Sequence, residues 1–213
     1  MTNYRMNTKL KITIILTLVI ITIITCINPI FPEDQYLQHI GTLLLMVPML
    51  YDIKKNIFTN ASFIGLSVFT LLHIIGARYV YSNVPYDEAI QQLFGFSINE
   101  MIGATRNHYD RIVHFSFGLL MLPLFCQLVE RKIKCSKCVA VVFAWLFIQT
   151  ASMIYELFEW LLTIVMTTEA ANNYNGQQGD MWDAQKDMAL AFVGSTITAV
   201  IMIFKTIKVN KPK

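Results

Sequence analysis

The 213-residue sequence is poor in charge: 15% of its residues are Asp, Glu, Lys or Arg, whereas 55% are hydrophobic. Soluble domains carry about a quarter of charged residues, so soluble enzymes, nucleic-acid-binding proteins and disulfide-stabilised scaffolds are excluded. A Gly-rich phosphate loop, a nucleophile elbow and a pair of broken transporter helices are also lacking. Among four cysteines, Cys135 and Cys138 form a lone C-x-x-C, which we interpret as two ordinary thiols.

The sequence contains long uncharged runs in place of the charged residues of a soluble domain. Each run is about 17–22 residues long, the length that a helix needs to cross about 30 Å of hydrocarbon. The sequence therefore predicts an all-α fold, a polytopic membrane helical bundle with about six transmembrane helices. We expect residues 1–213 to form a single integral membrane domain. The predicted spans are about 12–30, 36–51, 57–81, 109–129, 138–165 and 184–205.

The basic residues are distributed unevenly between the connecting segments. Of the 17 Lys and Arg residues, all except Arg78, Arg106, Arg111 and Lys186 fall in the termini or in the loops 52–56 and 130–137. Acidic residues show the opposite bias. Because cytoplasmic loops are enriched in Lys and Arg, both termini are predicted to be cytoplasmic. The first run is followed by no small-residue cleavage site, so we interpret it as a retained signal anchor.

Two predicted outer segments are longer than simple connections. In 82–107, Tyr86, Ile90 and Phe94 recur near helical spacing and predict a short helix in the membrane interface. Ser97 and Glu100 form a capping box for a second short helix. The polar segment 168–183 is predicted to be an ordered loop or lid. For 82–107 a lid and a dimer contact both fit the sequence.

Three polar patches occur next to the outer ends of the predicted spans. They comprise Asn107, His108, Asp110, Arg111 and His114; Glu156 and Glu159; and Asp180, Asp183 and Asp187. Within each patch, residues three or four apart share one helix face. Arg78 and Tyr81 close the third span at the same depth. Ionisable groups at membrane depth usually line a cavity, pair or bind a ligand, so we expect these residues to meet in one outward-facing site.

This layer has an excess of carboxylates, which a divalent metal ion would compensate. The candidate metal ligands are His114, Asp110, Glu159, Asp183 and Asp187. Mixed nitrogen and oxygen ligands suit Zn or Mn. Mg suits the site if histidine is not a ligand. The candidate catalytic residues are Glu156, Glu159 and Asp110, as general base or ligand. The candidate substrate-binding residues are Arg78, Arg111, Asn107, His108 and Tyr81, with the arginines anchoring an anionic head group.

Structural roles explain several of the same residues. Asp180 and Asp183 stand where helix-capping acids belong, and Arg111 with Asp110 or Glu159 would form a static pair between helices. His73, inside the third span, suits a helix-to-helix hydrogen bond as well as it suits the site. These alternatives stay open at the level of sequence.

The polar patches resemble the YjdF-type family of bacterial inner-membrane proteins. The resemblance covers the whole chain. It rests on four ordered blocks: Ile75-Gly76-Ala77-Arg78-Tyr79-Val80-Tyr81; Asn107-His108-Tyr109-Asp110-Arg111 with His114-Phe115; Tyr155-Glu156-Leu157-Phe158-Glu159-Trp160; and Gln178-Gly179-Asp180 with Trp182-Asp183 and Asp187-Met188. It implies a multi-pass protein of the bacterial cytoplasmic membrane. Some members have histidine where this chain has Arg78, so at that position anion binding fits better than metal ligation.

A weaker similarity is to VanZ-like membrane proteins. It consists of Asp110-Arg111 before His114-Phe115, an acid pair on the next helix, and an Asp-rich start of the last helix. This similarity implies a related bundle with an outward-facing polar site at the cell envelope, but it supplies no reaction.

Three functions fit these observations. The first is a metal-assisted hydrolase or transferase that acts on a lipid or lipid-linked envelope substrate. The second is a carrier or binding protein for an ion or small solute, which would need polar residues through the whole bundle. Phe115–Phe125, in which Ser116 is the only polar side chain, disfavours a carrier. The third is a structural or regulatory membrane subunit whose charges lock the helices. The expected partners are membrane lipids and a lipid-linked or anionic small molecule, not nucleic acid.

Overall fold

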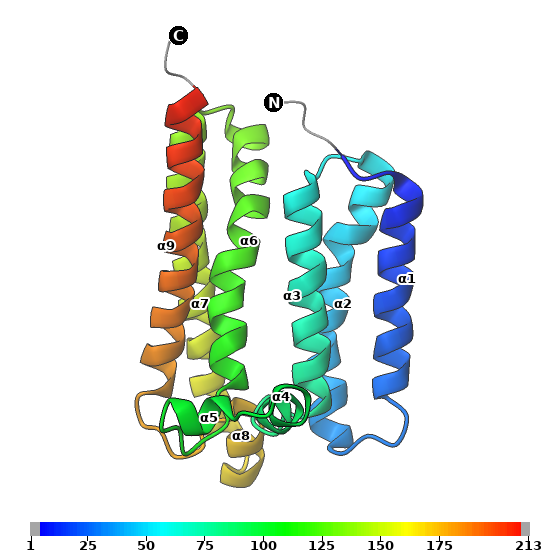
Figure 1. Cartoon of the computed structure of the whole chain (residues 1–213), viewed down its shortest axis with the longest axis vertical. Coiled ribbons are helices and arrows are strands. Elements are labelled where there is room, and N and C mark those ends of the chain that lie inside the picture. Colours follow the sequence, from blue (N-terminus) through cyan, green and yellow to red (C-terminus); the bar gives the residue numbers. More distant parts are fainter. Residues whose placement is uncertain (1–4, 210–213) are drawn as a thin grey trace.

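A computed structural model describes residues 5–209, apart from the side chains of residues 169, 170, 172, 173 and 209. The regular elements within these residues are helices. They are α1 (Thr8–Thr25), α2 (Pro32–Lys55), α3 (Asn60–Arg78), α4 (Tyr86–Phe94), α5 (Ile98–Met101), α6 (Tyr109–Ile133), α7 (Lys137–Val165), α8 (Thr168–Asn175) and α9 (Asp183–Val209). Figure 1 shows α1, α2, α3, α6, α7 and α9 side by side as an up-and-down bundle. The predicted all-α membrane bundle is confirmed.

Five of the long helices, α1, α3, α6, α7 and α9, are long and apolar enough to cross a membrane. The sixth, α2, carries charged residues at both ends but has 24 residues, about 36 Å of helix. Since α1 and α3 run in the same direction, α2 must return the chain across the bundle between them (Figure 1). We therefore count α2 as a sixth crossing. The start of α1 and the end of α9 lie at the same end of the bundle.

The first helix ends earlier than the predicted span 12–30. It stops at Thr25, and Asn28 adopts a left-handed backbone conformation with φ 48°. Pro29 follows, and a proline disfavours the helical conformation of the residue before it. Helix starts agree better with the sequence, because Asn7, Thr59 and Ser136 cap α1, α3 and α7 with their side chains.

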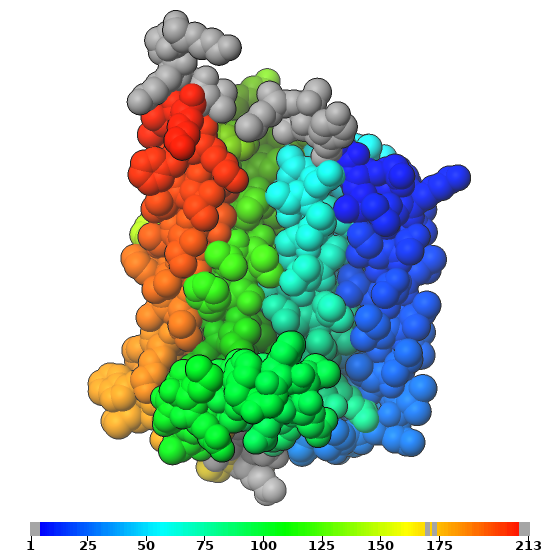
Figure 2. Space-filling model, in the orientation of Figure 1, coloured from blue at the N-terminus to red at the C-terminus, as the bar shows by residue number. Residues whose placement is uncertain are grey.

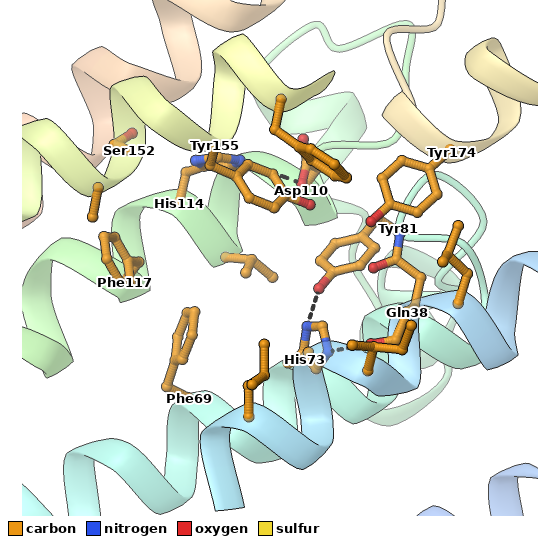
Figure 3. Close-up of a pocket in the computed structure, with 17 residues that line it drawn as sticks. Gln38, Phe69, His73, Tyr81, Asp110, His114, Phe117, Ser152, Tyr155 and Tyr174 are labelled. Atoms are coloured by element: carbon orange, nitrogen blue, oxygen red, sulfur yellow. Dashed lines mark hydrogen bonds and ion pairs between the residues drawn. The ribbon is translucent and has the colours of Figure 1, made fainter. Parts of the chain in front are cut away.

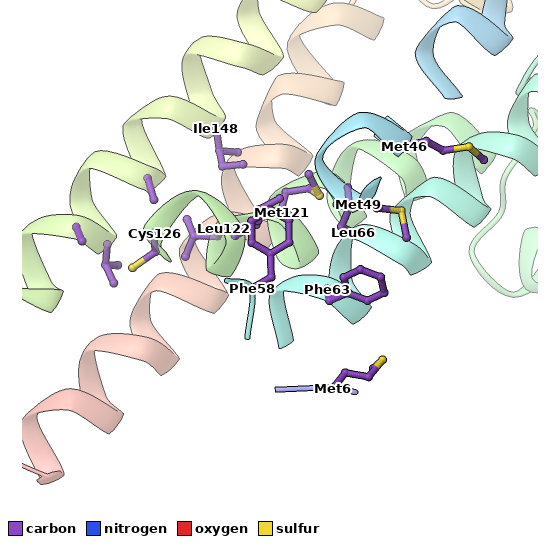
Figure 4. Packing of buried hydrophobic residues seen from close by; sticks show 14 of the residues in the cluster. Met6, Met46, Met49, Phe58, Phe63, Leu66, Met121, Leu122, Cys126 and Ile148 are labelled. Atoms are coloured by element: carbon purple, nitrogen blue, oxygen red, sulfur yellow. The ribbon is translucent and has the colours of Figure 1, made fainter. Parts of the chain in front are cut away.

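The bundle consists of two halves that meet mainly along α3 and α6. One half contains α1, α2 and α3, and the other contains α6, α7 and α9. Buried apolar side chains fill the part of the bundle nearer the chain termini, as Figure 4 shows for Phe63, Leu66, Met121, Leu122 and Ile148. This packing leaves the opposite end of the bundle for polar side chains.

The closest helix contact is between α6 and α9. A Cβ atom on Gly118 would lie 2.1 Å from the carbonyl oxygen of Ala191, and one on Gly194 would lie 2.2 Å from that of Phe115. Small residues let membrane helices approach with backbone against backbone. The Thr198 hydroxyl also donates to the Leu119 carbonyl across this contact, at 2.8 Å.

An ion pair between Lys11 and Asp52 is buried at the termini end. The two side chains lie 2.5 Å apart and are 1% and 0% exposed. The other oxygen of Asp52 accepts from the backbone N–H groups of Ile57 and Phe58, both at 2.7 Å. Lys11 precedes the predicted span 12–30, yet it lies inside the bundle and fixes α1 against α2.

The short helices lie at the opposite end. In Figure 2 the segment of α4 and α5 spreads across the lower front of the molecule. Both of the short helices predicted in 82–107 are present, and Ser97 caps α5 by accepting from the Glu100 N–H at 3.0 Å. The segment 168–183 differs from the predicted loop, because its first half forms α8 beside α7.

Candidate functional site

A cavity of about 430 Å³ lies between the two halves of the bundle, near the end that carries the short helices. Figure 3 shows its walls, which come from α2, α3, the turn after α3, α6, α7 and α8. Most of the lining is apolar, including Phe69 and Phe117. The polar side chains in the wall include Gln38, His73, Tyr81, Asp110 and His114.

Asp110, His114 and Asp187 come together beside this cavity. One ligand atom from each lies within 4.8 Å of the others, and all three residues are buried. Asp110 and His114 are one turn apart on α6, and Asp187 approaches from α9. The close contact at Gly118 lies one turn further into the membrane from His114 and allows this approach. Glu156 of α7 adds a fourth group, with its Oε1 3.6 Å from His114 Nε2.

The two distances from His114 to its neighbouring carboxylates are longer than hydrogen bonds and close to the separation of two ligands on one ion. His114 Nε2 is 3.7 Å from Asp110 Oδ1 and 3.6 Å from Glu156 Oε1, longer than a hydrogen bond. Two ligands on a tetrahedral Zn ion at about 2.1 Å would be about 3.4 Å apart. Glu156 Oε1 and Asp187 Oδ1 are buried without a hydrogen-bond partner among the described residues. Buried carboxylate oxygens are costly to leave unpaired, so an ion would satisfy them.

The neighbouring ion pairs hold the outer end of the site together. Arg106 lies 2.6 Å from Asp183, and Arg111 contacts Asp180 and lies 3.4 Å from Asp183. Lys186 adds a contact of 2.6 Å to Asp180. Hydrogen bonds from Lys186, the Trp182 backbone and Arg111 lower the pKa of Asp180 below its ordinary value. Asp183 therefore pairs with arginines, unlike the group of Asp110, His114 and Asp187.

On the other side of the cavity, His73 connects Tyr81 to α2. Its Nδ1 is hydrogen-bonded to the Tyr81 hydroxyl, and its Nε2 lies 2.9 Å from the Gln38 carbonyl oxygen (Figure 3). Tyr81, a predicted substrate-binding residue, is part of the cavity wall. The proposed helix-to-helix hydrogen bond of His73 is also present.

The remaining predicted site residues lie around the cavity rather than in it. Arg78 donates to the carbonyl oxygens of Thr25 and Ile27, at 2.6 and 3.3 Å, and so ties the α1–α2 connection to α3. Glu159 is not in the group around His114, and its backbone carbonyl accepts from the Asn175 side chain at 3.0 Å.

Asn107 and His108 hold the start of α6 in place. The Asn107 side chain donates to the Val84 carbonyl at 2.8 Å and accepts from the Tyr109 N–H at 2.9 Å. His108 Nδ1 faces Arg111 at 3.1 Å. Burial, together with the positive charge of Arg111, lowers the pKa of His108.

Comparison with known proteins assigns the chain to a family. Residues 10–207 match the family described as "Predicted membrane protein (DUF2238)". The chain belongs to this family. It is also similar to the protein "Inner membrane protein YjdF" of Escherichia coli (strain K12), with 28% identity over 190 residues that cover 88% of this chain and 86% of that protein. No solved structure matches the chain.

Membership of the family confirms the predicted resemblance and the location as a multi-pass protein of the bacterial inner membrane. The comparisons name no reaction, cofactor or ligand. The chemistry of this family member must therefore be argued from its own side chains.

Several cavity residues were missed by the sequence analysis. They are Gln38 of α2, Ser152 and Tyr155 of α7, and Tyr174 of α8. Burial and the nearby charge of Glu159 raise the pKa of Tyr174 to about 12, so its hydroxyl stays protonated. A stripe of polar residues in α2, Gln35, Gln38 and Thr42, was the available signal, because residues three or four apart on an otherwise apolar helix mark an inward face.

Proposed function

We propose that the chain is a membrane-embedded enzyme that uses a divalent metal ion to hydrolyse or transfer a group of a lipid or lipid-linked substrate. The carrying observation is the buried group of Asp110, His114 and Asp187 at the edge of a largely apolar cavity. Apolar walls hold an acyl or isoprenoid chain, and convergent polar groups fix the reacting end.

The ion would be held by Asp110, His114 and Asp187, with Glu156 beside them. Nitrogen and oxygen ligands favour Zn or Mn. When bound, such an ion polarises an ester or phosphoryl oxygen and lowers the pKa of bound water. Glu156 has a buried oxygen with no hydrogen-bond partner in the described part of the chain, so it is placed to accept a proton from an attacking water or hydroxyl.

The shape of the cavity supports a lipid substrate. Ile40 and Leu44 of α2 and Phe158 of α7 line the cavity and are also 54%, 67% and 43% exposed. In the membrane these faces contact lipid, so the cavity borders the bilayer between α2 and α7. A lipid chain can reach the site sideways without leaving the hydrocarbon.

The packing below the cavity favours an enzyme over a carrier. Phe63, Leu66, Met121, Leu122 and Ile148 are buried between the cavity and the termini end of the bundle. A carrier needs polar groups along the whole path. This apolar packing separates the titratable side chains that line the cavity from the buried Lys11–Asp52 pair at the termini end.

The first test is metal content by elemental mass spectrometry of detergent-purified protein. We expect near-stoichiometric Zn or Mn in the wild type and loss of the metal in His114→Ala and Asp187→Asn. Asp180→Asn is the matched control, because Asp180 is an aspartate of the same layer that pairs with Arg111 outside the metal group. A well-folded wild type without metal, or His114→Ala that keeps its metal, would contradict the proposal. Metal-loaded protein would then be screened against lipid-linked esters and phosphates.

A further inference from the structure

The His73–Tyr81 pair is more than a contact between helices. His73 Nε2 faces a carbonyl oxygen, which only accepts, so Nε2 carries the proton and donates to Gln38. The other nitrogen of neutral histidine, Nδ1, is then the acceptor, and the Tyr81 hydroxyl donates to it. The arrangement is a hydroxyl, a histidine base and a carbonyl that orients the base. This is the order of groups that activates nucleophiles in enzymes.

The backbone around Tyr81 is built to hold this arrangement. Val80 and Tyr81 have φ values of 49° and 56°, in the left-handed region that β-branched and bulky residues avoid. Such backbone strain clusters at functional sites. The unusual turn after α3 points the Tyr81 side chain back toward His73, as Figure 3 shows.

Two glycines make room for the same pair. A Cβ atom on Gly76 would lie 2.8 Å from the ring of Tyr81, and one on Gly41 would lie 2.8 Å from His73 Nε2. Two close approaches and a strained turn therefore serve one hydrogen-bonded pair. A simple hydrogen bond between helices needs neither the glycines nor the strained turn.

We propose that Tyr81 is a nucleophile activated by His73, and that it takes an acyl group from a lipid ester bound in the cavity. This rests on the proposed function for its substrate class. Tyr81 Oη forms a bond to the ester carbon, and the bond from that carbon to the leaving oxygen breaks. The hydroxyl proton passes to His73 Nδ1 and from there to the leaving oxygen. Water or an acceptor hydroxyl then cleaves the tyrosyl ester and returns a proton to Tyr81 through His73.

The test uses hexadecylsulfonyl fluoride, a probe with a lipid-like tail, and full-length protein in detergent. Tyr81 Oη displaces fluoride by forming an O–S bond, while His73 takes the proton. Mass spectrometry of peptides then measures the labelling rate of each tyrosine. Tyr109 is the internal control for a buried tyrosine without a base, because it lies beside Tyr81 and its hydroxyl donates at 2.8 Å to the Leu72 carbonyl.

We expect Tyr81 to be labelled about 100-fold faster than Tyr109, the lower range of what a general base contributes. His73→Gln keeps an amide donor for the Gln38 carbonyl but removes the base, so labelling of Tyr81 falls by a similar factor. Equal labelling of Tyr81 and Tyr109 in the wild type would overturn the proposal without any variant. Unchanged labelling of Tyr81 in folded His73→Gln would overturn it as well.

Metal content separates this inference from the proposed metal site. Tyr81→Phe is expected to lose labelling and to keep the metal, because Tyr81 is not in the group of Asp110, His114 and Asp187. A metal-free wild type in which labelling still depends on His73 would remove the metal reaction and retain the activated tyrosine. A metal-loaded wild type with unlabelled Tyr81 would remove the activated tyrosine and retain the metal site.

Discussion

Gly118→Ala tests whether the contact between α6 and α9 positions the candidate metal site. The new methyl carbon would lie 2.1 Å from the Ala191 carbonyl oxygen and 2.6 Å from the Ser195 backbone nitrogen. Carbon and carbonyl oxygen tolerate about 3.3 Å, so the helices must move apart by about 1.2 Å. Both neighbours are backbone atoms, and no side-chain rotation relieves the contact.

The size of this movement decides which property changes most. Overpacking costs about 1–3 kcal/mol of stability, of which the better helix propensity of alanine offsets about 1 kcal/mol. Metal ligands, by contrast, tolerate about 0.2 Å. His114 is one turn from Gly118, so a movement of about 1 Å separates it from Asp187. We therefore expect a modest loss of stability and a severe loss of metal affinity.

The assays are thermal unfolding in detergent and metal titration by calorimetry. Gly65→Ala is the matched control, because its methyl carbon would lie 2.5 Å from the Leu120 carbonyl oxygen at the α3–α6 contact. It should lower stability in the same range and leave metal affinity close to that of the wild type, since the ligands are on α6 and α9. A Gly118→Ala variant that binds metal as tightly as the wild type, or an equal loss of metal in both variants, would show that the α6–α9 contact does not position the site.

Further predictions concern other parts of the molecule. Lys11→Met leaves the Asp52 carboxylate buried and unpaired, so we expect a loss of about 3–5 kcal/mol in thermal unfolding, and a loss below 1 kcal/mol would show that water reaches Asp52. The hydrogen bond from Lys186 lowers the pKa of Asp180 below its ordinary 3.8, so its stabilisation is present above about pH 4 and disappears as the pH falls further. Unfolding of Asp180→Asn between pH 5 and pH 3 should therefore depend less on pH than unfolding of the wild type, and identical slopes would disprove this. Ile40→Trp narrows the side of the cavity that borders lipid and should reduce crosslinking to a photoreactive phospholipid while metal content stays unchanged; undiminished crosslinking would place the entry elsewhere.

Much of the fold could be predicted because the membrane limits what a chain can form. Apolar runs must become helices, since helices satisfy every backbone hydrogen bond internally. Charged flanks predict their direction. The short helix at Tyr86–Phe94 and the capped turn at Ser97 could also be predicted, because helical spacing and capping are local properties of the sequence. The end of α1 was predicted too late, because apolar character continues beyond Thr25 although the backbone turns.

Counting residues along each span was enough to predict that the polar patches share one layer of the bundle, because depth follows from position along a helix. Which carboxylates meet depends on how the helices pack. Asp187 joins Asp110 and His114, whereas Asp183, one turn earlier, pairs with arginine. That choice depends on how α9 is rotated and how closely it approaches α6 at Gly118. Rotation and approach result from packing between residues distant in sequence, and spacing along a single helix carries no information about either.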